Sequence, residues 1–163
     1  MSVRTFVAVW GTLLVALVLT VLHLPPGAAA WLAWVRPDWV AVILLYWVMA
    51  VPQQVGMGTA WLAGLLVDSV TGSLLGQHAL ALVFIAWAGL SLYQRLRMYS
   101  LLQQSSIVFA TVLVAHCLDL WVESLLRGNA WTPLVLLPPL LSAMLWPPLF
   151  VALRALRRRL QIA

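Results

Sequence analysis

Apolar residues fill most of the chain in long runs, and short breaks rich in polar residues, glycine or proline separate these runs. A helix needs about 20 mainly apolar residues to cross a bilayer. The pattern predicts six transmembrane helices, at residues 5–22, 38–51, 55–70, 74–93, 107–126 and 134–153. The predicted fold is therefore all-α, a polytopic membrane helical bundle in which residues 1–163 form a single integral membrane domain.

Prolines and tryptophans lie between the first two runs. Trp31 and Trp34 lie beside a proline-rich stretch, so residues 31–37 either lie in the membrane interface or begin the second span. Ala28 to Ala30 resemble the cleavage site of a signal peptide. The first run is longer than a signal core and further spans follow, so we expect a retained first helix. Paired prolines predict a kinked or ragged last helix.

Composition supports the membrane assignment. Of 163 residues, 64% are hydrophobic and only 8% are charged, whereas about a quarter of a typical soluble domain is charged. Little chain remains for a separate soluble domain. The single cysteine, Cys117, excludes an intramolecular disulfide and a cysteine-based metal motif.

The charges predict the orientation. The chain has nine arginines, no lysine, three aspartates and one glutamate, for a net charge of +5. With the N-terminus inside, seven arginines are cytoplasmic and two, Arg36 and Arg127, are outside. The seven are Arg4, Arg95, Arg97, Arg154, Arg157, Arg158 and Arg159. This bias predicts that both termini are cytoplasmic, and it explains the basic charge without nucleic acid.

Small residues recur in the third run. The residues spaced four apart are Gly56, Ala60, Gly64, Asp68 and Gly72. Such a face lets another helix approach closely, either within this chain or from a partner protein. Asp68 is a functional candidate because a carboxylate in an apolar helix is costly. The alternative is that Asp68 has a structural role, in which it pairs with His78 or an outer arginine or caps the break at residues 69–76.

The fifth run carries a polar stripe. Its members are His116, Asp119, Glu123 and Arg127, which share one narrow helix face. One interpretation is a structural ladder in which Glu123 meets Arg127; another is a proton relay or a polar substrate pocket. The spacing matches no recognised metal site. We expect no metal or cofactor, and no nucleophile elbow or phosphate-binding loop points to an enzyme.

The C-terminal arginines continue an apolar helix. Arg154, Arg157, Arg158 and Arg159 form a basic tail. They either fix topology and anchor the chain to lipid headgroups or dock a cytoplasmic partner.

A set of motifs resembles the MreD family of bacterial rod shape-determining membrane proteins. The motifs are Arg36-Pro37-Asp38-Trp39, Tyr46-Trp47, Pro52, Gly58-Thr59, Gly64, Asp68, Gly72-Ser73, Leu75-Gly76, the 119–123 stretch and Leu145-Trp146-Pro147. The resemblance runs from about residue 36 to 155. Arg-Pro-Asp-Trp leading into a short aromatic-ended span and a glycine- and aspartate-containing hairpin is its most distinctive part.

The resemblance implies a non-enzymatic subunit of the cell-elongation complex in the inner membrane. Its expected partners are MreC first, then MreB, RodZ, RodA and its class B penicillin-binding protein, within membrane lipid. MreC would contact the small-residue faces and an outer rim at Arg36, Trp39 and Trp131. The chain is also similar in span count and hydropathy to the substrate-binding subunits of energy-coupling-factor vitamin transporters. That alternative predicts an outer pocket lined by Asp68, His116, Asp119 and Glu123.

The predicted orientation is testable by cysteine labelling. With Ala163→Cys in a Cys117→Ser background, we expect no reaction with a membrane-impermeant maleimide in intact spheroplasts and full reaction after lysis. Labelling of intact spheroplasts would overturn the cytoplasmic placement of the C-terminus.

Overall fold

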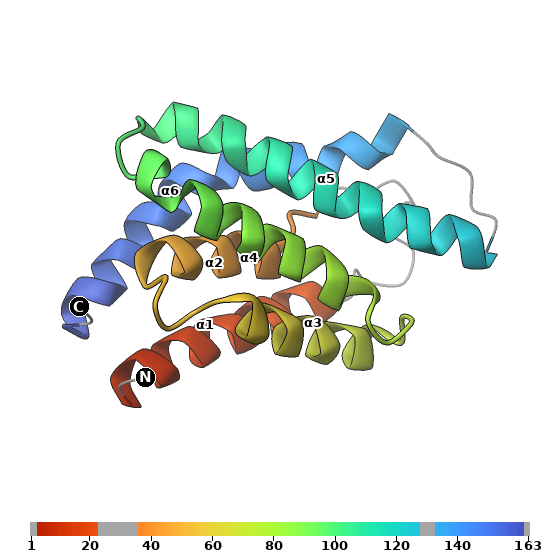
Figure 1. The fold of residues 1–163 in the computed structure, drawn as a ribbon, viewed down its shortest axis with the longest axis horizontal. Coiled ribbons are helices and arrows are strands. Elements are labelled where there is room, and N and C mark those ends of the chain that lie inside the picture. The colour runs from red at the N-terminus through yellow and green to blue at the C-terminus, as the bar shows by residue number, and fades with distance from the viewer. Residues whose placement is uncertain (1–2, 23–35, 128–132, 162–163) are drawn as a thin grey trace.

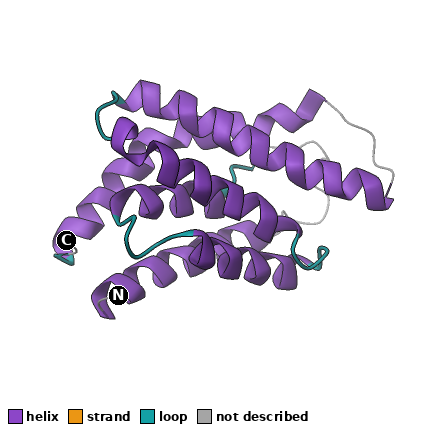
Figure 2. Cartoon of the chain, viewed as in Figure 1, coloured by secondary structure: helices purple, strands orange, loops and turns teal. Residues whose placement is uncertain are grey.

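The computed structural model describes residues 3–22, 36–127 and 133–161, and its regular structure there is entirely helical (Figure 2). The α-helices are α1 (Val3–Val21), α2 (Trp39–Ala50), α3 (Met57–Thr71), α4 (Gln77–Leu96), α5 (Leu101–Arg127) and α6 (Leu137–Arg159). A short 3-10 helix, η2 (Pro133–Leu136), precedes α6. The predicted all-helical fold with six helices is confirmed.

The two ends of the bundle differ in what they hold. The start of α1 and the end of α6 lie at one end, called here the terminal end (Figure 1). The ends of α1, α3 and α5 and the starts of α2, α4 and α6 lie toward the opposite end, called here the distal end. This alternation places both termini on one side, as the arginine distribution predicts.

Helix α2 forms the core of the bundle. Every residue from Val40 to Met49 is buried, on all sides of the helix. Its neighbours are α1, α4, α5 and α6 (Figure 1). A helix that is apolar all round is stable only when it is enclosed in this way.

The exterior of the bundle is apolar. Large side chains such as Val7, Leu14, Trp87 and Met144 are more than half exposed. Four helical segments are long and apolar enough to cross a membrane: Val3–Val21, Gln77–Leu96, Leu101–Leu125 and Leu134–Arg159. A water-soluble protein does not expose so much apolar surface, so the chain is a multi-pass membrane protein.

Helices α2 and α3 are shorter than a full crossing. They contain 12 and 15 residues, whereas a crossing takes about 20. Residues 51–56 connect them, turning at the terminal end and returning toward the middle of the bundle (Figure 1). The short second run therefore corresponds to a short buried helix.

Two helices extend beyond their predicted spans. Helix α5 begins at Leu101, six residues before the predicted 107, because Ser100 and Gln103 form a reciprocal cap. The Ser100 N–H donates to Gln103 Oε1 and the Gln103 N–H donates to Ser100 Oγ, an arrangement that starts helices. Helix α6 continues through Pro147 and Pro148 into the basic tail. The segment with Trp31 and Trp34 lies outside the described residues.

The small-residue face of α3 meets α4. An added Cβ at Gly64 would lie 2.2 Å from the Cα of Ala79, so the two backbones touch there. Ala60 is fully buried, and Gly72 ends α3 with a φ of +67° that suits glycine. The sequence left open whether this face packs within the chain or against a partner protein. At Gly64 the structure shows packing within the chain.

Gly64→Ala tests this close approach. We expect it to destabilise the protein by about 1–3 kcal/mol, because backbone atoms of α4 must move. Gly58→Ala in the same helix is the control, because no atom lies within 4 Å of its added Cβ; it should be neutral or slightly stabilising. Thermal unfolding in detergent measures both, and equal melting temperatures would show that α3 and α4 do not touch at Gly64.

Candidate functional site

Asp68 holds the connection between α3 and α4. Its Oδ1 accepts hydrogen bonds from Ser73 Oγ (2.8 Å) and from the His78 backbone N–H (3.0 Å). His78 Nδ1 lies 2.8 Å from the same oxygen, and Oδ2 accepts from the Gly76 N–H (2.8 Å). The side chain is fully buried. Burial of this carboxylate is tolerable because both oxygens are satisfied by polar groups of the break and α4.

This arrangement matches the structural alternative that the sequence left open for Asp68. The side chain both pairs with His78 and caps the break after α3. The Asp68 oxygens are occupied by groups of its own chain. His78 lines a nearby cavity, described next, but Asp68 does not.

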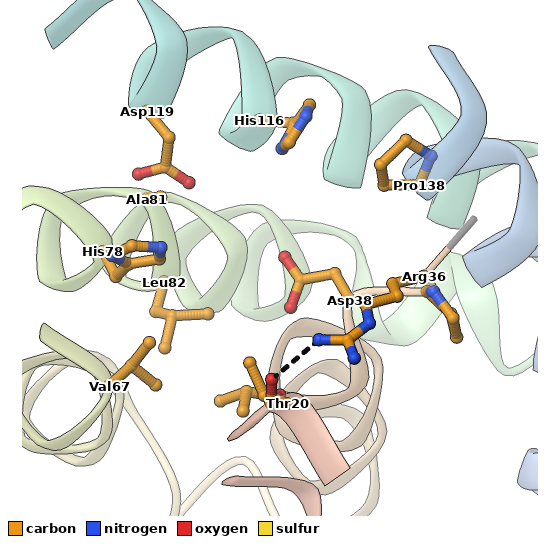
Figure 3. Close-up of a pocket in the computed structure, with 12 residues that line it drawn as sticks. Thr20, Arg36, Asp38, Val67, His78, Ala81, Leu82, His116, Asp119 and Pro138 are labelled. Atoms are coloured by element: carbon orange, nitrogen blue, oxygen red, sulfur yellow. Dashed lines mark hydrogen bonds between the residues drawn. The ribbon is translucent and has the colours of Figure 1, made fainter. Parts of the chain in front are cut away.

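A cavity of about 360 Å³ lies at the distal end (Figure 3). It is called here the distal cavity. Polar residues from four parts of the chain line it: Thr20, Arg36, Asp38, His78, His116 and Asp119. Its apolar lining comes from Pro37, Val40, Val67, Ala81, Leu82 and Pro138. All six α-helices or the segments that lead into them contribute, so the cavity forms only when the bundle assembles.

Arg36 and Asp38 fix the entry of α2 into the bundle beside this cavity. Asp38 Oδ1 accepts from the Ala41 N–H (3.1 Å), which caps the helix. The Asp38 N–H donates to Ser142 Oγ (2.9 Å) of α6. The Arg36 guanidinium donates to the carbonyls of Thr20 (3.4 Å) and Leu22, which end α1. These contacts tie α1, α2 and α6 together.

His116 and Asp119 lie three residues apart on α5 and both line the cavity (Figure 3). The buried atoms His116 Nε2 and Asp119 Oδ1 have no hydrogen-bond partner among the described residues. The Asp119 backbone carbonyl accepts from Gln77 Nε2 (3.2 Å), which holds α5 against α4. Two unpartnered polar atoms in a cavity can bind water or one polar group of a ligand.

The other two members of the polar stripe, Glu123 and Arg127, belong to the last turns of α5. Glu123 lies on the same helix and is half-buried, and the side chain of Arg127 lies outside the described residues, as does Trp131. Trp39 packs partly buried against the core. Within the described ranges, no group of three or more histidine, cysteine, aspartate or glutamate side chains could hold a metal ion.

A second polar network lies at the terminal end. Gln104 is buried on α5, and its Nε2 donates to the carbonyls of Leu96 (3.0 Å) and Tyr99 (3.1 Å). Its Oε1 accepts from Trp146 Nε1 (3.1 Å) of α6. Arg97 Nη2 donates to the carbonyls of Met49 (3.1 Å) and Ala50 (3.4 Å), which end α2. From the sequence, Arg97 was interpreted only as a determinant of membrane topology. Gln104 was missed, and the only sequence feature that could have indicated its role is an amide side chain beside an apolar run.

Comparison with known proteins gives a family match over almost the whole chain. The family described as rod shape-determining protein MreD matches residues 2–156. The chain belongs to the MreD family. A curated relative, the rod shape-determining protein MreD of Haemophilus influenzae, is 34% identical over 158 residues, which cover 96% of this chain and 97% of the relative. No solved structure matches the chain.

The motifs that resemble MreD have structural places in this bundle. Arg36 and Asp38 anchor α2, Asp68 and Gly76 form the break before α4, and Trp146 is buried against Gln104. Several of these motifs therefore coincide with polar contacts that join or cap helices.

Asp68→Ala tests the role of the buried carboxylate. It would leave the Gly76 and His78 N–H groups without their acceptor, and we expect a loss of about 2–4 kcal/mol in stability. Ser69→Ala is the control, because its exposed hydroxyl bonds only to the Leu65 carbonyl; it should change stability by less than about 0.5 kcal/mol. The melting temperature of purified protein measures both. An unchanged value for Asp68→Ala would refute the structural role.

Proposed function

We propose that this chain is a non-enzymatic subunit of the bacterial cell-elongation complex. It resides in the inner membrane with both termini in the cytoplasm, and it acts as one membrane domain. It binds the transmembrane helix of MreC and so helps organise peptidoglycan synthesis by MreB, RodZ, RodA and its class B penicillin-binding protein. Membership of the MreD family supports this proposal.

The MreC helix needs a lipid-facing surface that this chain leaves open. The small-residue face of α3 is closed at Gly64 by α4. A groove of about 550 Å³ between α5 and α6 offers an alternative. It is lined by Leu102, Ser105, Ser106, Phe109, Leu140, Ala143, Met144 and Pro147. This is called here the α5–α6 groove.

The small residues of the α5–α6 groove are the observation that supports MreC binding at this surface. Ser105, Ser106 and Ala143 keep side-chain bulk low between two helices, which is how transmembrane helices come into close contact. The serine hydroxyls already donate to the carbonyls of Leu101 (3.0 Å) and Leu102 (3.3 Å). An apolar helix can therefore enter without stranding a polar group.

Ser106→Trp tests the docking site by filling the groove from an exposed position. We expect it to reduce the amount of MreC that co-purifies by about ten-fold, because a helix can no longer pack there. Val114→Trp on the same helix is the control: Val114 is 44% exposed and lies outside the groove. Equal MreC recovery with both variants, each folded as wild type, would place MreC elsewhere, such as the outer rim near Arg36 and Trp39.

The distal cavity favours one second candidate function, the binding of a small polar molecule by a transport subunit. The unpartnered atoms of His116 and Asp119 are the observation behind it. Mass spectrometry of the same purified samples separates the two candidates. For the cell-elongation subunit we expect MreC without a stoichiometric small molecule. A ligand that disappears with Asp119→Asn, while MreC binding survives, would favour the transport subunit.

A further inference from the structure

A third hollow lies at the terminal end, beside the end of α2. Its volume is about 570 Å³, and it is called here the basic groove. The end of α2, the turn between α4 and α5, and the last turns of α6 form its walls. Its basic and polar lining includes Arg97, Arg154, Arg157, Tyr46, Tyr99 and Gln104.

The charge of the basic groove is not balanced by side-chain carboxylates. All four acidic residues of the chain, Asp38, Asp68, Asp119 and Glu123, belong to the distal half of the bundle. Three arginines line the groove, and Arg158 lines a smaller hollow that shares Arg154 and Arg157 with it. Arginines gathered away from the acidic side chains favour an anionic ligand, and the guanidinium fork matches a phosphate group best.

The groove is built rather than a loose gathering of surface arginines. The hydrogen bonds of Arg97 to the Met49 and Ala50 carbonyls hold its guanidinium at the end of α2. Its guanidinium carbon also lies 5.9 Å from the centre of the Tyr93 ring. Arg157 and Tyr46 line the same groove. Arg97 is thus positioned by the chain, which lowers the entropy cost of binding.

The remaining wall of the groove is apolar. Met49, Leu101, Phe150 and Val151 line it, and Leu101 and Val151 are exposed on the outside of the bundle. A site that combines arginines with an apolar wall at the end of a transmembrane bundle suits a lipid, whose phosphate meets the cations while its acyl chains follow the helices.

We propose that the basic groove binds the phosphate group of an anionic ligand, supplied by a phospholipid headgroup. Arg97 from the α4–α5 turn and Arg154 from α6 both line the groove and supply the cations for the phosphate. The site is separate from the α5–α6 groove and does not depend on MreC.

Arg154→Gln is the informative variant, because Arg154 is exposed and lies outside the hydrophobic core. Arg95→Gln and Arg159→Gln are matched controls: each removes one positive charge from an exposed residue at the same end, outside the groove. Native mass spectrometry with added phosphatidylglycerol or phosphatidylcholine measures retained lipid. We expect wild type to retain phosphatidylglycerol selectively, and Arg154→Gln to bind it about ten-fold more weakly, with less than about two-fold change in either control.

A second measurement distinguishes the source of the phosphate. Melting temperatures are recorded in detergent with phosphatidylglycerol alone or with inorganic phosphate alone. Stabilisation of wild type by the lipid only, absent in Arg154→Gln, supports a lipid headgroup. Stabilisation by inorganic phosphate with the same dependence on Arg154 supports a phosphate site for a soluble ligand. Equal binding of the two lipids without stabilisation by phosphate, or equal losses in all three variants, would overturn the proposal.

Discussion

The enclosure of α2 is the constraint on which the rest of the structure depends. It is apolar on every side, and its neighbours bury every residue from Val40 to Met49. In a membrane, the backbone groups at the ends of such a helix must be satisfied by the protein. Asp38 provides a carboxylate for the first turn, and Arg97 provides a cation for the last carbonyls. Each charge also complements the helix dipole at its own end.

The two large polar hollows follow from the shortness of α2. Because this central helix does not reach across a bilayer, space remains beyond each of its ends. The distal cavity lies beside Asp38, with α5 supplying His116 and Asp119. The basic groove lies beside Met49 and Ala50, with α6 supplying Arg154 and Arg157. The distal cavity combines Asp38 and Asp119 with Arg36 and two histidines, whereas the basic groove holds three arginines and no acidic residue.

The sequence predicted the helices well because apolar runs carry that signal locally. It also placed His116 and Asp119 on one face and found the small residues by which α3 meets α4. It could not show that the second run is enclosed, because an apolar helix facing lipid has the same composition. The start of α5 was predicted six residues late, since the Ser100 and Gln103 cap is polar. Contacts such as Asp38 with Ser142, 104 residues apart, have no local signature.

Tryptophan scanning of α2 tests the enclosure most directly. A helix that faces lipid tolerates tryptophan at every third or fourth position, whereas an enclosed helix has no room for added bulk on any face. Each position from Val42 to Leu45, four consecutive buried residues that cover every face of α2, is replaced in turn. The yield of folded protein is measured, with Val7 and Leu14 of α1 as exposed references. The account predicts loss of folded protein at every α2 position and retention at both references. Periodic tolerance along α2 would contradict it.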